Sequence, residues 1–364
     1  MGEYVRVGQR EQGRDVDKLR VAVIPGDGVG PEVLAEVLPL LEWARGRGRH
    51  LEWERFPHGA DHYLATGEAL SEATFESLRD DFDAILFGAV GDPRVPDGRH
   101  AEGLLLRLRQ GLDLTVNWRP CTPFLAAHSP LRDRSPGDQV LEVFRENTEG
   151  PYGLQGTREA GRAVDWAIHT EGAIDRLLES AFQRALQRSH PLTLAHKANV
   201  LKHGHGLWME RFRILAGRYP AVDARAMHAD ALLCALIQDP RPFGIVAADN
   251  YLGDLISDLT AAFMGGMGMA PSLSFAPHRP FRCAALAEPV HGSAPDLAGH
   301  GIANPVGAIL SLGLLFEHLG WAGEATAIRE AVAGALQAGA ATRELGGSLG
   351  TADMGNAIRH HLQA

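Results

Sequence analysis

RVAVIPG, residues 20–26, is a short run rich in β-formers that ends at a glycine. The GDGVGPE that overlaps its end, residues 26–32, leads into a helix expected to begin near Pro31. Similar short apolar runs recur along the chain at residues 84–90, 140–147, 192–200 and 243–250. Helical patterns separate these runs, and strands alternating with amphipathic helices predict an α/β protein with a largely parallel sheet.

The clearest helical pattern covers residues 170–188, where apolar side chains recur three and four positions apart behind Thr170 as a predicted N-cap. Two stretches rich in Pro, Gly and Arg, residues 91–103 and 119–138, are predicted to be loops that could border domains. Residues 1–18 are polar and charged, and we expect a flexible leader there.

Composition narrows the class of protein. A chain of 364 residues with 45% hydrophobic and 22% charged residues is expected to fold, most simply as two domains. Its net charge of -10 disfavours nucleic acid as a partner, and its longest apolar run, residues 308–316, is too short for a membrane span. The three cysteines form no CxxC pair and no secretory signal is visible, so a cytoplasmic protein is expected.

The glycine-rich stretch GDGVGPE superficially suggests a dinucleotide-binding loop. The G-x-G-x-x-G pattern needs a third glycine, and this chain has Pro31 there. A Rossmann fold is therefore not supported. The stretch is equally compatible with a tight structural turn and with a loop that binds a ligand.

Asp254 and Asp258 lie four residues apart on a predicted helix and project from the same face. Like charges at this spacing repel unless a cation lies between them, and carboxylates without nearby cysteine or histidine suit Mg²⁺ or Mn²⁺. On this spacing alone, a solvated helix face is the simpler explanation of the pair. A third carboxylate, such as Asp230 in an otherwise apolar stretch, would favour the metal site.

Arg109, Arg119 and Arg145 lie at or near the ends of predicted elements, where guanidinium groups could bind the carboxylates of a di- or tricarboxylate substrate. Most arginines of this arginine-rich chain must lie on its surface, so each one alone is weak evidence. Lys197 is one of only three lysines, which suggests a role in proton transfer that arginine cannot fill. Tyr152 is a candidate general acid, although either residue could be structural.

Residues 288–305, rich in Gly, Pro, Ser and Asn, are predicted to form a long functional loop. Its acidic Asp296 would favour a ribose diol over a 2′-phosphate, and therefore NAD over NADP. The remaining histidines, among them His203, His205, His360 and His361, are expected on the surface and are assigned no metal.

Five segments, taken in order, are similar to the β-decarboxylating dehydrogenase family, which includes isopropylmalate, isocitrate, homoisocitrate, tartrate and D-malate dehydrogenases. They are GDGVGPE (26–32), RENTEGPYG (145–153), KANV (197–200), NYLGDLISD (250–258) and EPVHGSAPDLAGHGIANP (288–305). The resemblance extends from about residue 20 to the C-terminus. It implies two α/β domains on a mixed sheet that is not Rossmann, with the active site in the cleft between them and shared across a homodimer. An NAD-binding domain would comprise 19–114 and 265–364, and a substrate, metal and dimerisation domain 115–264.

The resemblance also implies individual roles. Tyr152 would be the general acid and Lys197 the proton-handling lysine supplied by the partner subunit. Arg109, Arg119 and Arg145 would bind the substrate carboxylates. Asp230, Asp254 and Asp258 would bind Mg²⁺ or Mn²⁺, with Asp230 supplied across the dimer and also lining the substrate site. The NAD loop would include His291, Gly292, Ser293, Ala294, Asp296 and Asn304.

The expected reaction is the NAD-dependent oxidative decarboxylation of a (2R)-2-hydroxy acid of the 3-substituted malate type. Glu102, Leu105 and Leu106 match the glutamate and leucine pair of isopropylmalate dehydrogenases, which favours 3-isopropylmalate or a close 3-alkylmalate and suggests leucine biosynthesis. Isocitrate is disfavoured because its third carboxylate would meet apolar surface.

Two alternatives stay open. Stretches such as NWRP and the apolar segment that follows residue 305 look more like tartrate and D-malate dehydrogenases, although those carry tryptophan where this chain has Glu102. Asp249 and His196 also depart from the residues usual in isopropylmalate dehydrogenases, which are glycine or threonine at the position of Asp249 and aspartate at the position of His196. These departures leave room for a different 3-substituted malate as substrate. A non-catalytic nucleotide-binding or regulatory relative is the remaining alternative, and the presence of every expected catalytic residue argues against it.

Overall fold

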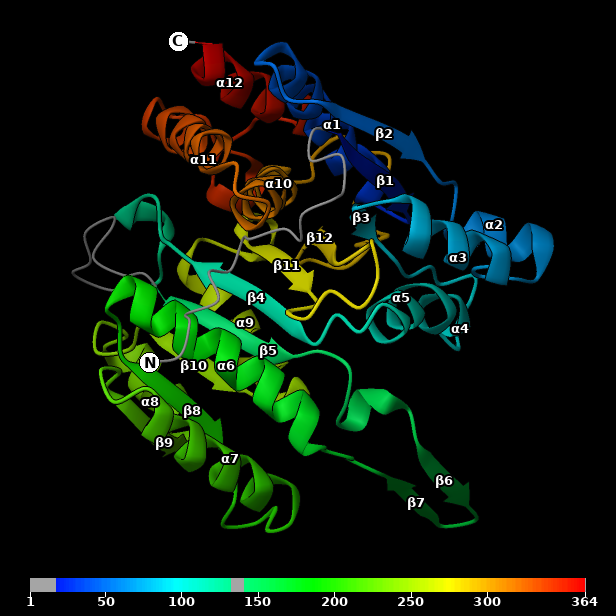
Figure 1. Cartoon of the computed structure of the whole chain (residues 1–364). Coiled ribbons are helices and arrows are strands. Elements are labelled where there is room, and N and C mark those ends of the chain that lie inside the picture. The colour runs from blue at the N-terminus through cyan, green and yellow to red at the C-terminus, as the bar shows by residue number, and fades with distance from the viewer. Residues whose placement is uncertain (1–17, 132–140, 364) are drawn as a thin grey trace.

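The computed structural model describes residues 18–131 and 141–363, so the predicted leader lies outside the described residues except for Lys18. A ten-stranded sheet runs through the whole molecule (Figure 1). Across the sheet the strands are β2 (Leu51–Arg55), β1 (Leu19–Gly26), β3 (Ala84–Ala89), β12 (Ala285–Pro289), β11 (Pro271–Phe275), β4 (Val116–Cys121), β5 (Leu141–Glu146), β10 (Ile245–Ala248), β8 (Leu192–His196) and β9 (Ala224–His228).

The sheet consists of two parallel halves joined by antiparallel strands. Strands β2, β1, β3 and β12 are parallel to one another, and so are β5, β10, β8 and β9. Between them, β11 is antiparallel to β12, and β4 is antiparallel to both β11 and β5. The expected mixed α/β architecture is therefore confirmed. The domain boundaries at 114/115 and 264/265 stay a prediction.

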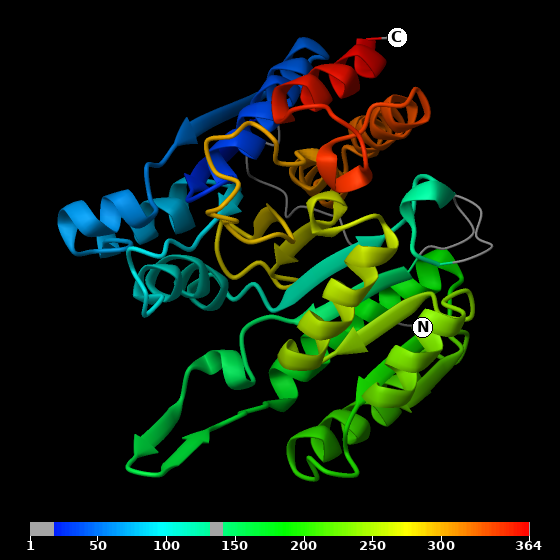
Figure 2. The same ribbon diagram turned by 180° about the vertical axis from the view of Figure 1, so that it is seen from behind.

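Helices cover both faces of this sheet. The longer ones are α1 (Gly30–Gly46), α2 (Ala60–Thr66), α3 (Glu72–Asp81), α6 (Glu171–Arg188), α7 (Gly204–Arg218), α8 (Ala229–Gln238), α9 (Asn250–Phe263), α10 (Val306–His318), α11 (Ala322–Gln337) and α12 (Thr351–Gln363). The short ones are α4 (Arg99–Ala101), the π-helix η1 (Glu102–Leu106), α5 (Arg107–Gly111), η2 (Ala126–His128), η3 (Pro151–Gly153), η4 (Met267–Met269) and η5 (Arg343–Leu345). Helix α6 lies in front of the sheet in Figure 1, whereas α9 lies on the opposite face, in front in Figure 2.

Most of the predicted elements are present. The apolar runs form β1, β3, β5, β8 and β10, and Thr170 caps α6 by accepting a hydrogen bond from the backbone N–H of Ala173. Two loop predictions were partly wrong. Residues 99–103 are already helical, and residues 119–121 complete β4, where pairing with β5 outweighs the local turn composition. The last part of the second predicted loop, 132–138, lies outside the described residues.

The three central strands carry a row of buried polar side chains on one face. Side chains alternate along a strand, and Arg145 pairs with Asn117, which in turn pairs with Ser274. These residues, with Arg119, therefore share the face that α9 covers. The residues between them, including Trp118, face α6 and the hydrophobic core. A buried polar stripe thus runs beneath α9.

A two-stranded arm, β6 (Gly156–Glu159) and β7 (Arg162–Asp165), extends away from the rest of the molecule in both views (Figures 1 and 2). Its strand residues are almost all exposed. None of the helices in the described part of the chain is long and apolar enough to cross a lipid bilayer.

Candidate active site

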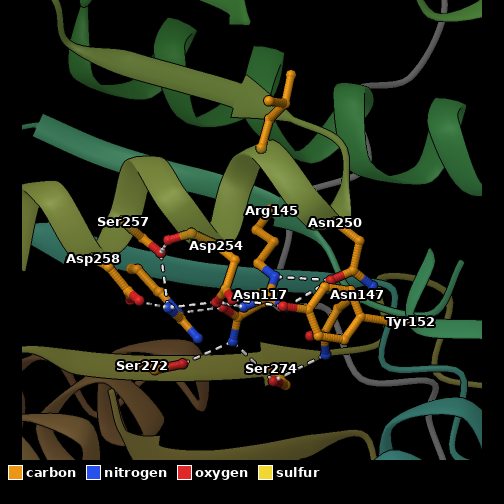
Figure 3. Close-up of polar contacts among 12 residues, drawn as sticks. Asn117, Arg145, Asn147, Tyr152, Asn250, Asp254, Ser257, Asp258, Ser272 and Ser274 are labelled. Carbon is orange, nitrogen blue, oxygen red and sulfur yellow. Dashed lines mark hydrogen bonds and ion pairs between the residues drawn. The ribbon is translucent and has the colours of Figure 1, made fainter. Parts of the chain in front are cut away.

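Tyr152, Arg145 and Asp254 form one contact group on the polar stripe (Figure 3). The phenol O–H of Tyr152, on η3, donates a 2.7 Å hydrogen bond to Oδ2 of Asp254 on α9. The guanidinium of Arg145 donates to Oδ1 of the same carboxylate and lies 4.9 Å from the centre of the Tyr152 ring. Asn250 holds the guanidinium of Arg145 in place, because Oδ1 of Asn250 accepts hydrogen bonds of 2.9 and 2.7 Å from Nε and Nη2 of Arg145.

Arg119 lies between the two aspartates whose spacing suggested a metal site. Its Nη1 is 3.4 Å from Oδ1 of Asp254 and 3.3 Å from Oδ1 of Asp258. The same Nη1 donates a 2.7 Å hydrogen bond to Ser257, and Nε donates a 2.7 Å bond to Asn117. The cation between the paired carboxylates is therefore the guanidinium of Arg119, and both carboxylates approach the same nitrogen atom.

The electrostatics of this group follow from burial and from its crowded charges. Burial, together with the positive charges of Arg119 and Arg109, lowers the pKa of Arg145 to about 10, against the opposing effect of Asp254. Burial likewise lowers the pKa of Arg119, against the opposing effect of Asp254. Three guanidinium groups gathered in one place suit a substrate with more than one carboxylate.

The acidic groups respond in different directions. Burial acts to raise the pKa of Asp254, but Arg145, Tyr152 and Arg119 outweigh it, so this pKa is lowered. The pKa of Asp258 is raised by burial, although Arg119 opposes the shift. Burial and the hydrogen bond to Asp254 raise the pKa of Tyr152, which keeps its phenol protonated.

A cleft of about 120 Å³ opens beside this group. Its lining includes Arg109, Arg119 and Leu105 together with His291 and Gly292. Arg109 is held there by Glu288, whose Oε1 accepts a 2.7 Å hydrogen bond from Nη2. The cleft therefore brings predicted substrate-binding residues next to the start of the predicted NAD loop.

The three predicted specificity residues lie on the π-helix η1 but in different environments. Leu105 lines the cleft, whereas Leu106 is half-buried and Glu102 is exposed. Neither Glu102 nor Leu106 is among the lining residues of this cleft in the described chain. Of the three, only Leu105 meets the space beside the arginines.

Lys197 and Asp230 form a second pair, separate from the first group. They follow β8 and β9, which are parallel neighbours, and the ammonium Nζ of Lys197 lies 2.9 Å from Oδ1 of Asp230. The hydrogen bond from Lys197 lowers the pKa of Asp230, which is exposed. Within the described residues, no hydrogen bond or ion pair joins this pair to Asp254 or Asp258.

The predicted NAD loop lies against the GDGVGPE segment. The backbone N–H of Val29 donates a 2.8 Å hydrogen bond to the carbonyl of Ser293, and a Cβ on Gly28 would lie only 1.9 Å from that carbonyl oxygen. The glycine is therefore required for close packing of the two segments. Along the same loop, Ala294 has a positive φ of 40° and Asp296 is exposed.

Asn304 closes the loop. It donates a 2.9 Å hydrogen bond to Glu344, and its Oδ1 accepts one of 3.2 Å from the N–H of Val306 at the start of α10. Both polar groups of this amide are therefore engaged within the chain. His291 is half-buried, and burial lowers the pKa of its imidazole.

Sequence reasoning missed the residues that hold the arginines in place, namely Asn117, Asn250, Ser257 and Glu288. The signal was present within the motifs already singled out. Asn250 and Ser257 lie four before and three after Asp254, which puts them on the same face of α9. Asn117 alternates with Arg119 in a buried strand, where a polar residue needs a partner.

The geometry agrees with the relationships of the chain. Residues 20–358 match the model of the isocitrate/isopropylmalate dehydrogenase family, and the chain belongs to this family. It is similar to the 3-isopropylmalate dehydrogenase of Thermobifida fusca, 43% identical over 94% of this chain and 98% of the relative. The 3-isopropylmalate dehydrogenase of Streptomyces coelicolor is also 43% identical, over 87% of this chain and 92% of the relative.

Solved structures of similar proteins share the fold. The isocitrate dehydrogenase of Methylococcus capsulatus superposes with a TM-score of 0.85 at 30% identity, covering 95% of this chain and 100% of that protein. A β-decarboxylating dehydrogenase from Thermococcus kodakarensis has a TM-score of 0.78 at 34% identity, with 95% and 96% covered.

Proposed function

We propose that this chain catalyses the NAD- and divalent-metal-dependent oxidative decarboxylation of a 3-substituted malate, with 3-isopropylmalate or a close 3-alkylmalate as substrate. One observation carries the proposal: a single cleft is lined by Arg109, Arg119, Leu105 and the first residues of the 291–304 loop. Carboxylate-binding groups, an apolar side chain and the predicted cofactor loop meet there. The names of the relatives support the same substrate.

The arginines would bind and orient the two carboxylates of the substrate. Arg109 and Arg119 reach the cleft from α5 and β4, and Arg145 lies beneath α9. Leu105 would contact the alkyl group at C3, where a third carboxylate would lose its hydration without gaining a partner. This contact is the physical basis for preferring an alkylmalate to isocitrate.

The donor set fits a hard divalent cation. Oδ1 of Asp254 and Oδ1 of Asp258 both approach Nη1 of Arg119 and therefore face a common point. Mg²⁺ or Mn²⁺ held by these two residues, together with Asp230 of a second copy, would lower the pKa of the substrate hydroxyl and stabilise negative charge on that oxygen. NAD⁺ on the 291–304 loop would accept the hydride from C2, and Asp296 would accept hydrogen bonds from a ribose diol.

Two side chains would handle protons. Lys197, as the neutral amine, would take the proton of the C2 hydroxyl at Nζ while the hydride leaves C2 for NAD⁺. When the carboxylate on C3 departs as CO₂, its bonding electrons remain on the substrate, and Tyr152 would deliver its phenol proton to C3. The raised pKa of Tyr152 supports this role, because a general acid must hold its proton until that step.

We infer that the active enzyme is a homodimer. Lys197 and Asp230 pair with each other apart from Asp254, so a complete site needs these residues from a second copy. Large apolar side chains are also exposed near the arm, on α9 and after β8: Leu154, Trp166, Ile168, Tyr251, Leu255, Val200 and Leu201. Burial of these side chains against a second copy would remove them from water.

The predicted division into an NAD-binding domain and a substrate, metal and dimerisation domain is part of this proposal. The two parallel halves of the sheet support it, since each half is built from one of the two sets of residues. A cytoplasmic location is also proposed, because the three cysteines are free thiols that suit a reducing compartment.

The test compares substrates on one enzyme preparation. NADH formation is followed by absorbance with Mg²⁺ and either 3-isopropylmalate, D-malate, tartrate or isocitrate. We expect the highest kcat/KM for 3-isopropylmalate. A lead for D-malate or tartrate would mean that Leu105 serves only helix packing, and no turnover of any of the four would reject the proposed function.

A further inference from the structure

His205 is buried, contrary to its predicted surface position, because of the strand order around it. Asp249 follows β10 and Lys197 follows β8, and these two strands are parallel neighbours. His205 lies in the first turn of α7, with only 1% of its surface exposed. The ring therefore lies between the chain at Lys197 and the start of α9.

Each ring nitrogen of His205 faces a defined group. Nδ1 accepts a 2.9 Å hydrogen bond from the backbone N–H of Lys197. Nε2 lies 3.1 Å from Oδ2 of Asp249, which is its nearest charged partner among the described residues, although the bond is not well aligned. Oδ1 of Asp249 accepts a 2.7 Å hydrogen bond from the N–H of Leu252 and so caps α9.

A metal ion would be a different interpretation of the same cluster. Candidate ligand atoms of His169, His205 and Asp249 lie within 4.8 Å of one another. A histidine that binds a metal offers one nitrogen lone pair and donates its other N–H to an acceptor. Here Nδ1 of His205 faces the N–H of Lys197, and Nδ1 of His169 accepts a 3.2 Å bond from the indole N–H of Trp208.

Each of these neutral imidazoles therefore carries its proton on Nε2 and has no lone pair left for a cation. The N–H donors of Lys197 and Trp208 therefore favour two imidazole rings that each carry a proton on Nε2, beside the carboxylate of Asp249. We do not interpret it as a metal site.

We propose that His205 is a positioning residue for Lys197 and that Asp249 selects the tautomer that this role requires. The inference rests on the proposed function, in which Lys197 handles a proton. Asp249 favours hydrogen on Nε2, which leaves the Nδ1 lone pair for the backbone N–H of Lys197. The carbonyl of Lys197 also accepts hydrogen bonds from the N–H groups of Val200 and Leu201, so both main-chain groups of the lysine are fixed.

The same carboxylate also orders residues of the other active site of the proposed dimer, because Lys197 and α9 of one chain serve different sites. By capping α9, Asp249 fixes the helix that carries Asp254 and Asp258. One side chain thus orients the main chain of the lysine that serves one site and the helix of the proposed metal ligands that serve the other. An isopropylmalate dehydrogenase with glycine in place of Asp249 would lack this connection.

The test uses variants that separate the two ring nitrogens. His205→Asn keeps an acceptor near the Nδ1 position, whereas His205→Gln keeps a donor near Nε2 and leaves the N–H of Lys197 without an acceptor. Asp249→Asn keeps the cap on Leu252 but turns an amide N–H towards Nε2 of His205, which disfavours the required tautomer. His169→Gln is the matched control, because it changes the same cluster without a contact to Lys197.

We expect kcat to fall roughly 10- to 100-fold in His205→Gln and Asp249→Asn with little change in KM, since small displacements of a catalytic group lower turnover more than binding. His205→Asn should recover most of this loss. The primary isotope effect with substrate deuterated at C2 should rise in the two slow variants. An equal loss of kcat in His169→Gln, or no rescue by His205→Asn, would overturn the proposal.

Hydrogen exchange measured on a peptide spanning Lys197 supplies a readout that needs no turnover. Exchange at this peptide should be at least roughly tenfold faster in His205→Gln than in the native chain and nearly native in His205→Asn. Faster exchange with unchanged kcat would overturn the positioning role. If the native chain oxidises none of the malates, the proposed function fails and the role falls with it, while the exchange data still report whether His205 holds this segment.

Discussion

Oδ2 of Asp254 accepts a 2.7 Å hydrogen bond from the phenol of Tyr152, a residue 102 positions earlier in the chain. The contact joins a proposed general acid to a proposed metal ligand. Burial is the main cause of the raised pKa of Tyr152, and this contact raises the pKa further. The phenol therefore stays protonated at neutral pH.

Tyr152→Phe should therefore lower kcat by roughly 10²- to 10⁴-fold, the usual contribution of a general acid, while NADH binding stays near native. Steady-state kinetics and a fluorescence titration with NADH measure the two quantities. Tyr219→Phe, which removes a hydroxyl from a ring stacked on Phe182, is the control. Full activity of Tyr152→Phe would exclude the assigned role.

Arg119→Met should raise the affinity for Mg²⁺ in the absence of substrate, by roughly threefold or more, while turnover collapses. The guanidinium lies within 3.4 Å of both aspartates and repels a second cation there. Calorimetric titration of Mg²⁺ into the substrate-free protein measures the change. Arg109→Met, which removes the partner of Glu288, should leave metal affinity near native, and weaker Mg²⁺ binding by Arg119→Met would contradict the proposed site.

Two inactive variants should restore each other if sites are shared between subunits. In a mixed dimer of Lys197→Ala and Tyr152→Phe, one site receives both native residues and the other receives neither. Random mixing after subunit exchange should then give about a quarter of native activity, because about half of the dimers are mixed. Mixtures that stay as inactive as the separate variants would show that each site is built from one chain.

Asp296→Lys should erode the preference for NAD over NADP. The exposed carboxylate would repel a 2′-phosphate, and an ammonium would attract it. The ratio of kcat/KM for the two cofactors is the measurement, with the exposed Glu330→Lys on α11 as a charge-matched control. A native enzyme that already prefers NADP would contradict the assignment of this loop.

Acid should destabilise the protein partly through His58. Burial, with a smaller contribution from His62, lowers the pKa of His58 from 6.5 to about 4. The unfolded chain then binds a proton that the folded chain does not, so this histidine contributes stability above pH 6.5 that is lost as the pH falls towards 4. The loss amounts to at most roughly 3 kcal/mol.

His58→Gln should flatten the decline of unfolding free energy over this pH range, as measured by urea unfolding at several pH values. His300→Gln, at an exposed histidine, should leave the decline unchanged. Parallel pH profiles for native protein and His58→Gln would contradict the assignment.

Local sequence patterns were sufficient to predict the elements whose signal lies within a few residues. The short apolar runs became strands, and Thr170 caps α6 as predicted. The pattern failed at the end of β4, because Pro120 and its neighbours resemble a loop in sequence although they pair with β5. Partners distant in sequence, such as Arg109 and Glu288, follow from strand order and not from spacing. His205 was misplaced for the same reason, since its burial depends on β10 lying beside β8.

The alternation along β4, β5 and β11 has an evolutionary consequence. Arg119 and Trp118 are successive residues on opposite faces, so a one-residue insertion or deletion within β4 would exchange them and drive the guanidinium into the core. Such a shift of the strand register would abolish both folding and catalysis. These strands can therefore diverge by substitution but not by indels, and changes of length around the substrate site must arise outside them, in segments such as the π-helix that carries Leu105.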